Sequence, residues 1–213
     1  MIFNLDTLKP KERKELDAET MEKYHKHYIN VLTSKFGLMR DDSNATAFDT
    51  VARYIALWQA ADEGKCDKPA KGLFLFGTPG AGKTTLMKMF SGLCEVQFIT
   101  MLELTKDFAL GQHERFWKTV DQFNGVPLIV DDLGGEDSTK SYGNEVPIPD
   151  FIRQREELWK NKGIITCYTS NAAKRDDITA RYGSSICSRI LGMCDFVKFT
   201  GSDRRIAARK ECA

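Results

Sequence analysis

The chain has 213 residues, of which 42% are hydrophobic, and this length and composition predict a single main domain with one substantial core. Its 31 Lys and Arg residues nearly balance its 30 Asp and Glu residues, so no overall charge excess indicates a nucleic-acid or membrane partner. The chain contains no run of about 18 apolar residues, and its first residues are too charged for a signal peptide, so we expect a cytoplasmic protein without a membrane partner.

Two amphipathic helices are predicted in the N-terminal part of the chain. Apolar residues recur at intervals of three to four positions over Asp17 to Phe36, and again over Phe48 to Gly64. Apolar helix faces usually pack within their own fold, so we interpret both stripes as core. We therefore divide the chain into an N-terminal helical region, residues 1–65, which is a candidate partner contact, and a main domain, residues 66–213.

From residue 71 onward the pattern changes to short apolar runs separated by helical stretches, which is typical of a parallel sheet flanked by helices. The runs are GLFLFG, EVQFIT, VPLIVDD, GIITCYTSN and DFVKFT. They do not alternate cleanly between apolar and polar residues, as expected of parallel strands that are buried on both faces. We therefore predict a three-layer α/β fold with a five-stranded parallel sheet.

A glycine-rich motif lies between the first predicted strand and the helix that follows it. The motif has the P-loop form GxxxxGK[ST] and consists of Gly77, Thr78, Pro79, Gly80, Ala81, Gly82, Lys83 and Thr84, with Thr85 next. Glycines let backbone amides turn toward phosphate oxygens, and the helix N-terminus adds partial positive charge. We expect Lys83 to reach the β- and γ-phosphates of ATP, and Thr84 to ligate Mg²⁺ through its hydroxyl.

Acidic and amide side chains end two later strands. Asp131 and Asp132 close the run VPLIVDD, and Asn171 ends the run GIITCYTSN. Ligands of open α/β sheets bind at the carboxyl ends of the strands, so we expect these side chains beside the P-loop. Asp131 would hold Mg²⁺, Asp132 would act as the base or water-orienting carboxylate, and Asn171 would contact the γ-phosphate or the attacking water. Such residues also form ordinary turns, so the assignment depends on the P-loop upstream.

Four segments in this order carry a family resemblance. GLFLFGTPGAGKTTL, PLIVDDLGGED, CYTSN and ARYGSSICSRILGMCDFVKFTGSDRR resemble the AAA+ ATPases of the DnaC/IstB-like group, which comprises replicative helicase loaders and transposition helper ATPases. The resemblance implies that Asn171 is the sensor 1 residue and that Arg189 is an arginine finger, which reaches the ATP of a neighbouring subunit. It also implies that Arg204, or Arg205 beside it, is a late sensor 2-like arginine.

The resemblance also implies partners, and the sequence departs from the general AAA+ pattern in two ways. It implies self-association in the ATP-bound state, hydrolysis that depends on assembly, and a replicative helicase as partner. Asp132 stands where AAA+ enzymes generally have glutamate, although a pair of aspartates is familiar in this group. The sequence stops at Ala213, so we expect the C-terminal helical lid to be truncated or absent.

Single-stranded DNA is a candidate partner for the segment from Leu102 to Phe123. The segment contains cationic and aromatic side chains, namely Lys106, His113, Arg115, Phe116, Trp117 and Lys118. Cations attract the DNA backbone and aromatic rings stack on bases, so this combination suits single strands. The same segment carries several acidic residues, so an ordinary amphipathic helix is the competing interpretation.

The motifs leave three functions open. The chain could be a helicase loader or primosome component that hydrolyses ATP, a transposition helper ATPase of the IstB type, or a non-hydrolysing, ATP-dependent interaction module. A small-molecule kinase is disfavoured because Arg153, Arg155 and Arg175 are too scattered to form a closing segment. A GTPase is disfavoured because the stretch NKGI lacks the aspartate of a guanine-binding NKxD motif.

Overall fold

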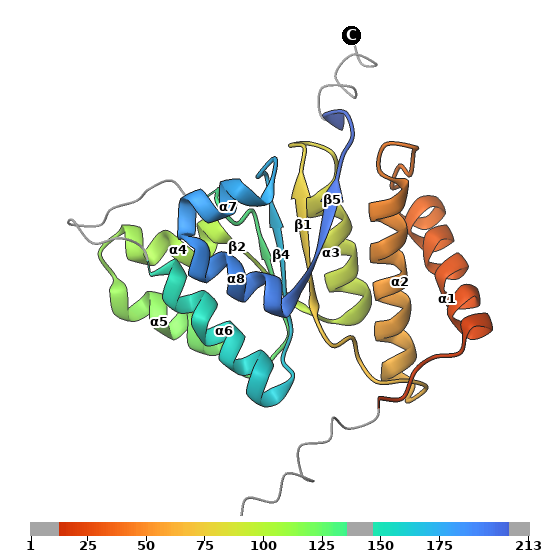
Figure 1. Cartoon of the computed structure of the whole chain (residues 1–213), viewed down its shortest axis with the longest axis horizontal. Coiled ribbons are helices and arrows are strands. Elements are labelled where there is room, and N and C mark those ends of the chain that lie inside the picture. The colour runs from red at the N-terminus through yellow and green to blue at the C-terminus, as the bar shows by residue number, and fades with distance from the viewer. Residues whose placement is uncertain (1–12, 136–146, 205–213) are drawn as a thin grey trace, which may run out of the picture.

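A computed structural model describes residues 13–135 and 147–204 of the chain (Figure 1). The strands are β1 (Gly72–Gly77), β2 (Gln97–Thr100), β3 (Leu128–Asp131), β4 (Thr166–Ser170) and β5 (Cys194–Phe199). The helices are α1 (Ala18–Asn30), the short π-helix η2 (Val31–Lys35), α2 (Ala45–Asp62), α3 (Lys83–Cys94), α4 (Met101–Ala109), α5 (His113–Gln122), α6 (Ile148–Lys162), α7 (Arg175–Tyr182) and α8 (Ser184–Met193). Arg205 and the end of the chain, where the sequence predicts a shortened lid, lie outside the described residues.

The strands form one parallel sheet in the order β2-β3-β4-β1-β5. Each predicted apolar run coincides with one of these strands, although β5 begins one residue before its run, so the predicted fold class and its five-stranded sheet are confirmed. All residues of β3 and β4 are buried, which explains why their sequences do not alternate between apolar and polar residues. The order places β1 between β4 and β5, so the loop that follows β1 begins inside the sheet and not at its edge.

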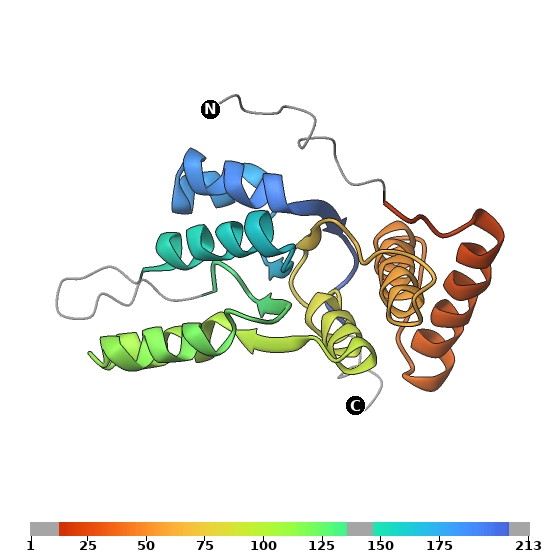
Figure 2. The same cartoon turned by 90° about the horizontal axis from the view of Figure 1, so that it is seen from below.

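Helices cover both faces of the sheet (Figures 1 and 2). On one face, the ring of Trp58 in α2 meets the ring of Phe90 in α3 edge to face, with 5.5 Å between centroids. On the other face, Phe116 of α5 and Phe151 of α6 are buried with Tyr168 of β4 in a second core cluster. The sheet therefore lies between two hydrophobic cores, as a three-layer fold requires.

The N-terminal helices extend one of these cores. The helix predicted over Asp17 to Phe36 is present as α1 followed by η2, and it begins where the Asp17 side chain accepts the Thr20 N–H at 2.9 Å. Helix α1 packs on α2 (Figure 2), and Leu32 of η2 belongs to the same core cluster as Leu73 of β1. The division predicted after residue 65 stays a prediction, although the helices before it share their core with the sheet.

The part of the chain that the structure describes contains no cluster of three or more His, Cys, Asp or Glu residues able to hold a metal ion. Its cysteines are buried free thiols, and burial raises the pKa of Cys167 to about 11. A buried thiol stays neutral, so it packs as a small apolar group and does not serve as a ligand. None of the described helices combines the length and the apolar character needed to cross a bilayer.

Arg155 of α6 connects the segments that lead into two central strands. It is 1% exposed, and its guanidinium donates to the carbonyls of Phe123, Val126 and Ile165 at 2.6, 3.0 and 3.2 Å and to Thr166 Oγ1 at 2.7 Å. These acceptors lie before β3 and at the start of β4. Burial lowers the pKa of Arg155, but an arginine stays protonated in proteins, so the hydrogen bonds persist.

Replacement of this side chain should destabilise the fold. Arg155→Met should lower the free energy of unfolding by about 2–4 kcal/mol, because buried carbonyls lose their donors. Urea unfolding followed by circular dichroism measures the loss. Arg153→Met is the control on the same helix, since Arg153 forms an exposed ion pair with Asp150, and it should cost below about 0.5 kcal/mol. Equal losses in the two variants would contradict this role of Arg155.

Candidate nucleotide-binding site

Three strand ends meet at the carboxyl edge of the sheet. β1 ends at Gly77, β3 ends at Asp131, and Asn171 follows β4 directly. Because β4 pairs with both β1 and β3, these residues approach one another at the start of α3. The structure therefore places the acidic and amide side chains beside the P-loop, while their roles toward metal, water and phosphate stay predictions.

The P-loop adopts backbone conformations that favour glycine. Gly77, Gly80 and Gly82 have φ of 130°, 74° and 111°. A Cβ added at position 80 would also lie 2.0 Å from Asp203 Oδ1, so the Asp203 side chain would have to move. The last of these glycines caps helix α3, so the loop delivers the chain directly to a helix N-terminus.

Lys83 and Asn171 join the P-loop to the end of β3. Lys83 is buried, and its Nζ donates to the carbonyls of Gly77 at 2.9 Å and Thr78 at 2.8 Å and to Asn171 Oδ1 at 3.0 Å. Asn171 Nδ2 donates to Asp132 Oδ1 at 2.7 Å. Because an ammonium group can only donate and a carboxylate can only accept, these two neighbours fix the orientation of the amide.

Thr84 and Asp131 supply oxygen atoms from two different elements. Thr84 Oγ1 donates to Asp131 Oδ1 at 2.9 Å, and Asp131 is 5% exposed. A hydroxyl and a buried carboxylate at hydrogen-bonding distance are the kind of oxygen ligands that Mg²⁺ prefers. The donor set therefore fits the predicted metal.

A polar cavity of about 240 Å³ brings together the predicted residues of the P-loop, β3 and β4. Its lining consists of Gly80, Gly82, Lys83, Thr84, Thr85, Asp131, Asp132, Thr169 and Asn171. Four predicted P-loop residues do not line it, namely Gly77, Thr78, Pro79 and Ala81. Pro79 is exposed, and Ala81 is buried and lines the neighbouring cavity. The sequence predicted each lining residue except Thr169, which lies inside the motif CYTSN but has no signal of its own in the sequence.

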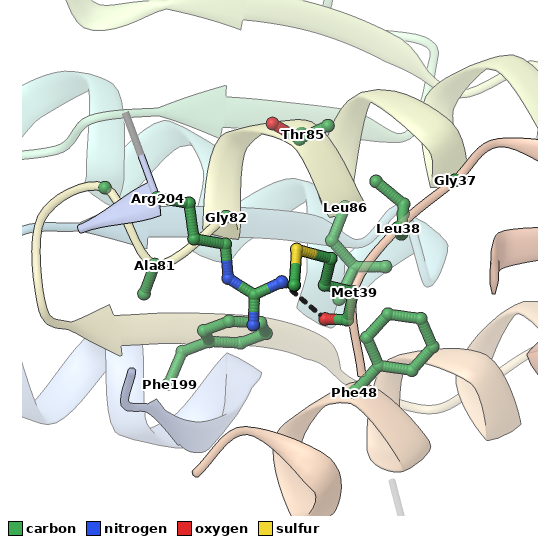
Figure 3. A pocket seen from close by; sticks show the side chains of 11 residues that line it. Gly37, Leu38, Met39, Phe48, Ala81, Gly82, Thr85, Leu86, Phe199 and Arg204 are labelled. Atoms are coloured by element: carbon green, nitrogen blue, oxygen red, sulfur yellow. Dashed lines mark hydrogen bonds between the residues drawn. The ribbon is translucent and has the colours of Figure 1, made fainter. Parts of the chain in front are cut away.

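A second cavity, mostly apolar and about 320 Å³ in volume, adjoins the first along the P-loop (Figure 3). Its lining consists of Gly37, Leu38, Met39, Phe48, Gly80, Ala81, Gly82, Thr85, Leu86, Phe199 and Arg204. The two cavities share Gly80, Gly82 and Thr85. Sequence reasoning missed the segment 37–39, which matches no motif in the sequence, and the structure shows Met39 there as a 66% exposed apolar side chain.

Arg204 braces the wall of this apolar cavity. Its guanidinium donates to the Met39 carbonyl at 2.6 Å (Figure 3) and to Asp41 Oδ2 at 2.7 Å, and its backbone N–H donates to the Gly80 carbonyl at 3.2 Å. A hydrogen bond from Ser43, together with the charge of Arg204, lowers the pKa of Asp41. Arg204 lines the apolar cavity and is not part of the polar one, and its sensor 2-like role stays a prediction.

Arg189 lies on α8, and its side chain contacts α6 and not the P-loop. Its guanidinium forms an ion pair with the buried Glu156 of α6, and it lines neither of the two cavities. Although burial favours the neutral acid, hydrogen bonds from Lys160 and Arg189 lower the pKa of Glu156. The role of Arg189 as an arginine finger stays a prediction, and its side chain does not line the polar cavity of its own chain.

The candidate DNA segment forms helices α4 and α5, which pack against each other. Phe116 is 0% exposed, so the expectation that its ring offers a stacking surface is wrong: the ring is part of the core. Lys106, Arg115 and Lys118 are exposed, although Lys118 pairs with Glu114 at 2.7 Å. The segment therefore presents cations, but Phe108 and Phe116 are buried in the core, and Trp117 packs against the same cluster.

The parallel sheet, together with the glycine-rich loop that leads from β1 into α3, is typical of the P-loop nucleoside triphosphatase fold. No model of a known protein family matches the chain, and no curated protein sequence matches it. Crystal structures with a similar fold include the DnaC helicase loader, at 18% identity and TM-score 0.57 over 82% of this chain and 99% of that chain. Another is a proposed primosome component from Streptococcus pyogenes serotype M3, at 18% identity and TM-score 0.55 over 78% of this chain and 85% of that chain. A third is a DNA replication initiation factor, at 14% identity and TM-score 0.54 over 83% of this chain and 52% of that chain. The chain has the fold of the DnaC-like AAA+ proteins, which confirms the sequence resemblance at the level of fold.

The position of Arg204 predicts how its replacement changes the affinity for nucleotides. Arg204→Ala should weaken the binding of ATP and of ADP by the same factor, about 3- to 10-fold, because the arginine supports the wall of the apolar cavity and does not line the polar one. Displacement of fluorescent ADP measures both affinities. Arg53→Ala, which removes a half-exposed ion pair with Glu22, is the control and should change neither. A clearly larger loss for ATP would favour a sensor 2-like contact instead.

Proposed function

We propose that the chain is an AAA+ protein of DNA replication that binds and hydrolyses ATP with Mg²⁺ and acts as a helicase loader or primosome component in the cytoplasm. The observation that carries the proposal is the convergence of Lys83, Thr84, Asp131, Asp132 and Asn171 on one polar cavity. The similar folds described as a helicase loader, a proposed primosome component and a replication initiation factor favour replication over transposition.

The two adjoining cavities suit the two ends of a nucleotide. The phosphates would lie in the polar cavity, where Lys83 and the amide groups at the start of α3 favour an anion. The base would lie in the apolar cavity against Met39, Phe48 and Phe199. Phosphate oxygens would compete with the carbonyls of the P-loop for the Lys83 ammonium.

Thr84 and Asp131 would hold the metal ion between them. Mg²⁺, when bound, supplies positive charge that offsets the negative charge of the phosphate oxygens. The contribution of the chain is to keep both ligands fixed, since the buried Asp131 carboxylate already accepts the Thr84 hydroxyl at 2.9 Å.

Asp132 is the group best placed to act on the attacking water. Its Oδ1 is held by Asn171 Nδ2 at 2.7 Å, and Asn171 Oδ1 accepts from Lys83 at 3.0 Å. The amide thus links the carboxylate that would orient the water and accept its proton to the lysine that would bind the γ-phosphate. This link is a physical basis for the sensor 1 role that the resemblance assigns to Asn171.

Association between copies of the chain would complete the catalytic site. We propose that ATP-bound copies associate and that Arg189 of one copy contacts the γ-phosphate bound to its neighbour, after leaving Glu156. A replicative helicase is the proposed protein partner. Single-stranded DNA would contact the exposed cations Lys106 and Arg115 of α4 and α5.

The P-loop lysine provides the direct test of nucleotide binding. Lys83→Ala should weaken ATP binding by at least about 100-fold, because the ammonium group is the cation of the phosphate cavity. Titration with a fluorescent ATP analogue measures the affinity. Lys88→Ala is the matched control, since Lys88 is an exposed lysine on the same helix, and it should bind ATP normally. Unchanged binding in Lys83→Ala would rule out this cavity as the phosphate site.

Arg189 provides the test of assembly-dependent hydrolysis. Specific ATPase activity should rise with protein concentration or with single-stranded DNA, and Arg189→Ala should lower it by about 10³-fold while ATP affinity is retained.

The control for that experiment is Glu156→Gln, which breaks the same ion pair but leaves the arginine in place. If the pair is only structural, the two variants should behave alike. If Arg189 acts on a neighbouring ATP, only Arg189→Ala loses turnover. Activity that is independent of concentration and insensitive to Arg189 would contradict the proposed assembly.

A further inference from the structure

The Thr169 side chain connects the two carboxylates that end β3. Its hydroxyl donates to Asp131 Oδ1 at 2.6 Å and accepts the backbone N–H of Asp132 at 2.9 Å. A hydroxyl has one proton and two lone pairs, so here the proton serves one aspartate and a lone pair serves the next. Thr169 is 1% exposed, which keeps bulk water from competing for either hydrogen bond.

The backbone after β3 depends on the same hydroxyl. Asp132 has φ of 63°, in the left-handed region that a residue with a side chain seldom adopts. The chain turns there: the Leu133 N–H donates to the Thr169 carbonyl, and the Gly135 N–H donates to the Asp132 carbonyl, both at 2.8 Å. Thr169 Oγ1 is the acceptor for the Asp132 amide within this turn, so it supports the unusual conformation.

We infer that Thr169 is a positioning residue that couples the metal-binding carboxylate of Asp131 to the water-orienting carboxylate of Asp132. The inference rests on the proposed function. Through its donated hydrogen bond, Thr169 fixes the orientation of the Asp131 carboxylate. Through its accepted hydrogen bond, it sets the backbone from which Asp132 reaches Asn171. Serine keeps both hydrogen bonds, whereas valine keeps the shape and removes both.

The test compares Thr169→Val and Thr169→Ser with a matched control, Thr105→Val. Thr105 is also buried, at 3% exposure, but its hydroxyl donates to the Met101 carbonyl within α4 at 2.8 Å. Three quantities are measured: ADP affinity in the presence of EDTA, Mn²⁺ affinity of the protein with ADP by electron paramagnetic resonance, and kcat for ATP with Mg²⁺.

Thr169→Val should lower Mn²⁺ affinity by about 10-fold and kcat by about 10- to 100-fold, the range found when outer-shell supports of metal ligands are lost. Its metal-free ADP affinity should stay within about twofold of the natural value, because Thr169 supports the carboxylates and not the P-loop amides. Thr169→Ser should restore Mn²⁺ affinity to within about threefold, and Thr105→Val should leave all three quantities unchanged.

Natural Mn²⁺ affinity in Thr169→Val would overturn the inference. A loss that Thr169→Ser does not restore, or a parallel loss of metal-free ADP binding, would overturn it as well, since either would indicate a general packing effect. Failure of the natural chain to bind ADP at all would instead overturn the proposed function, and the inference with it.

Discussion

The Asp131 carboxylate is the point at which three elements of the fold meet. Its Oδ1 accepts the hydroxyl of Thr84 from α3 at 2.9 Å and the hydroxyl of Thr169 from β4 at 2.6 Å. A carboxylate that is 5% exposed is stable only when donors or a cation offset its charge. These two hydrogen bonds therefore hold the end of β3 against β4 and against the helix that follows β1, and the polar cavity takes its shape from them.

The N-terminal helices complete the site from the other side. Phe48 of α2 and Met39, in the connection between η2 and α2, line the apolar cavity, and Arg204 joins that connection to the P-loop through Gly80. The region that the sequence suggests as a partner contact is thus part of the same packed unit as the proposed nucleotide site. Its shared core, which includes Trp58, explains how a distant segment is held beside the P-loop.

The predictable features are those carried by local sequence. Apolar runs identify the strands, and the P-loop and strand-end aspartates identify the polar cavity, because each motif lies at a strand end that the fold must bring to one edge. The missed features depend on long-range packing. The Arg204–Asp41 ion pair joins positions 163 residues apart, and the burial of Phe116 depends on how α5 meets α4 and the core. Thr169 was overlooked because its role requires the left-handed turn at Asp132.

If Mg-ATP binds where Lys83, Thr84 and Asp131 converge, a crystal structure with Mg²⁺ and a non-hydrolysable ATP analogue should show it there. We expect the Lys83 ammonium to move from the carbonyls of Gly77 and Thr78 to phosphate oxygens, with the metal ion beside Thr84 and Asp131 and the base in the apolar cavity. A nucleotide bound elsewhere, or a Lys83 that keeps its contacts with both carbonyls, would rule out this binding mode.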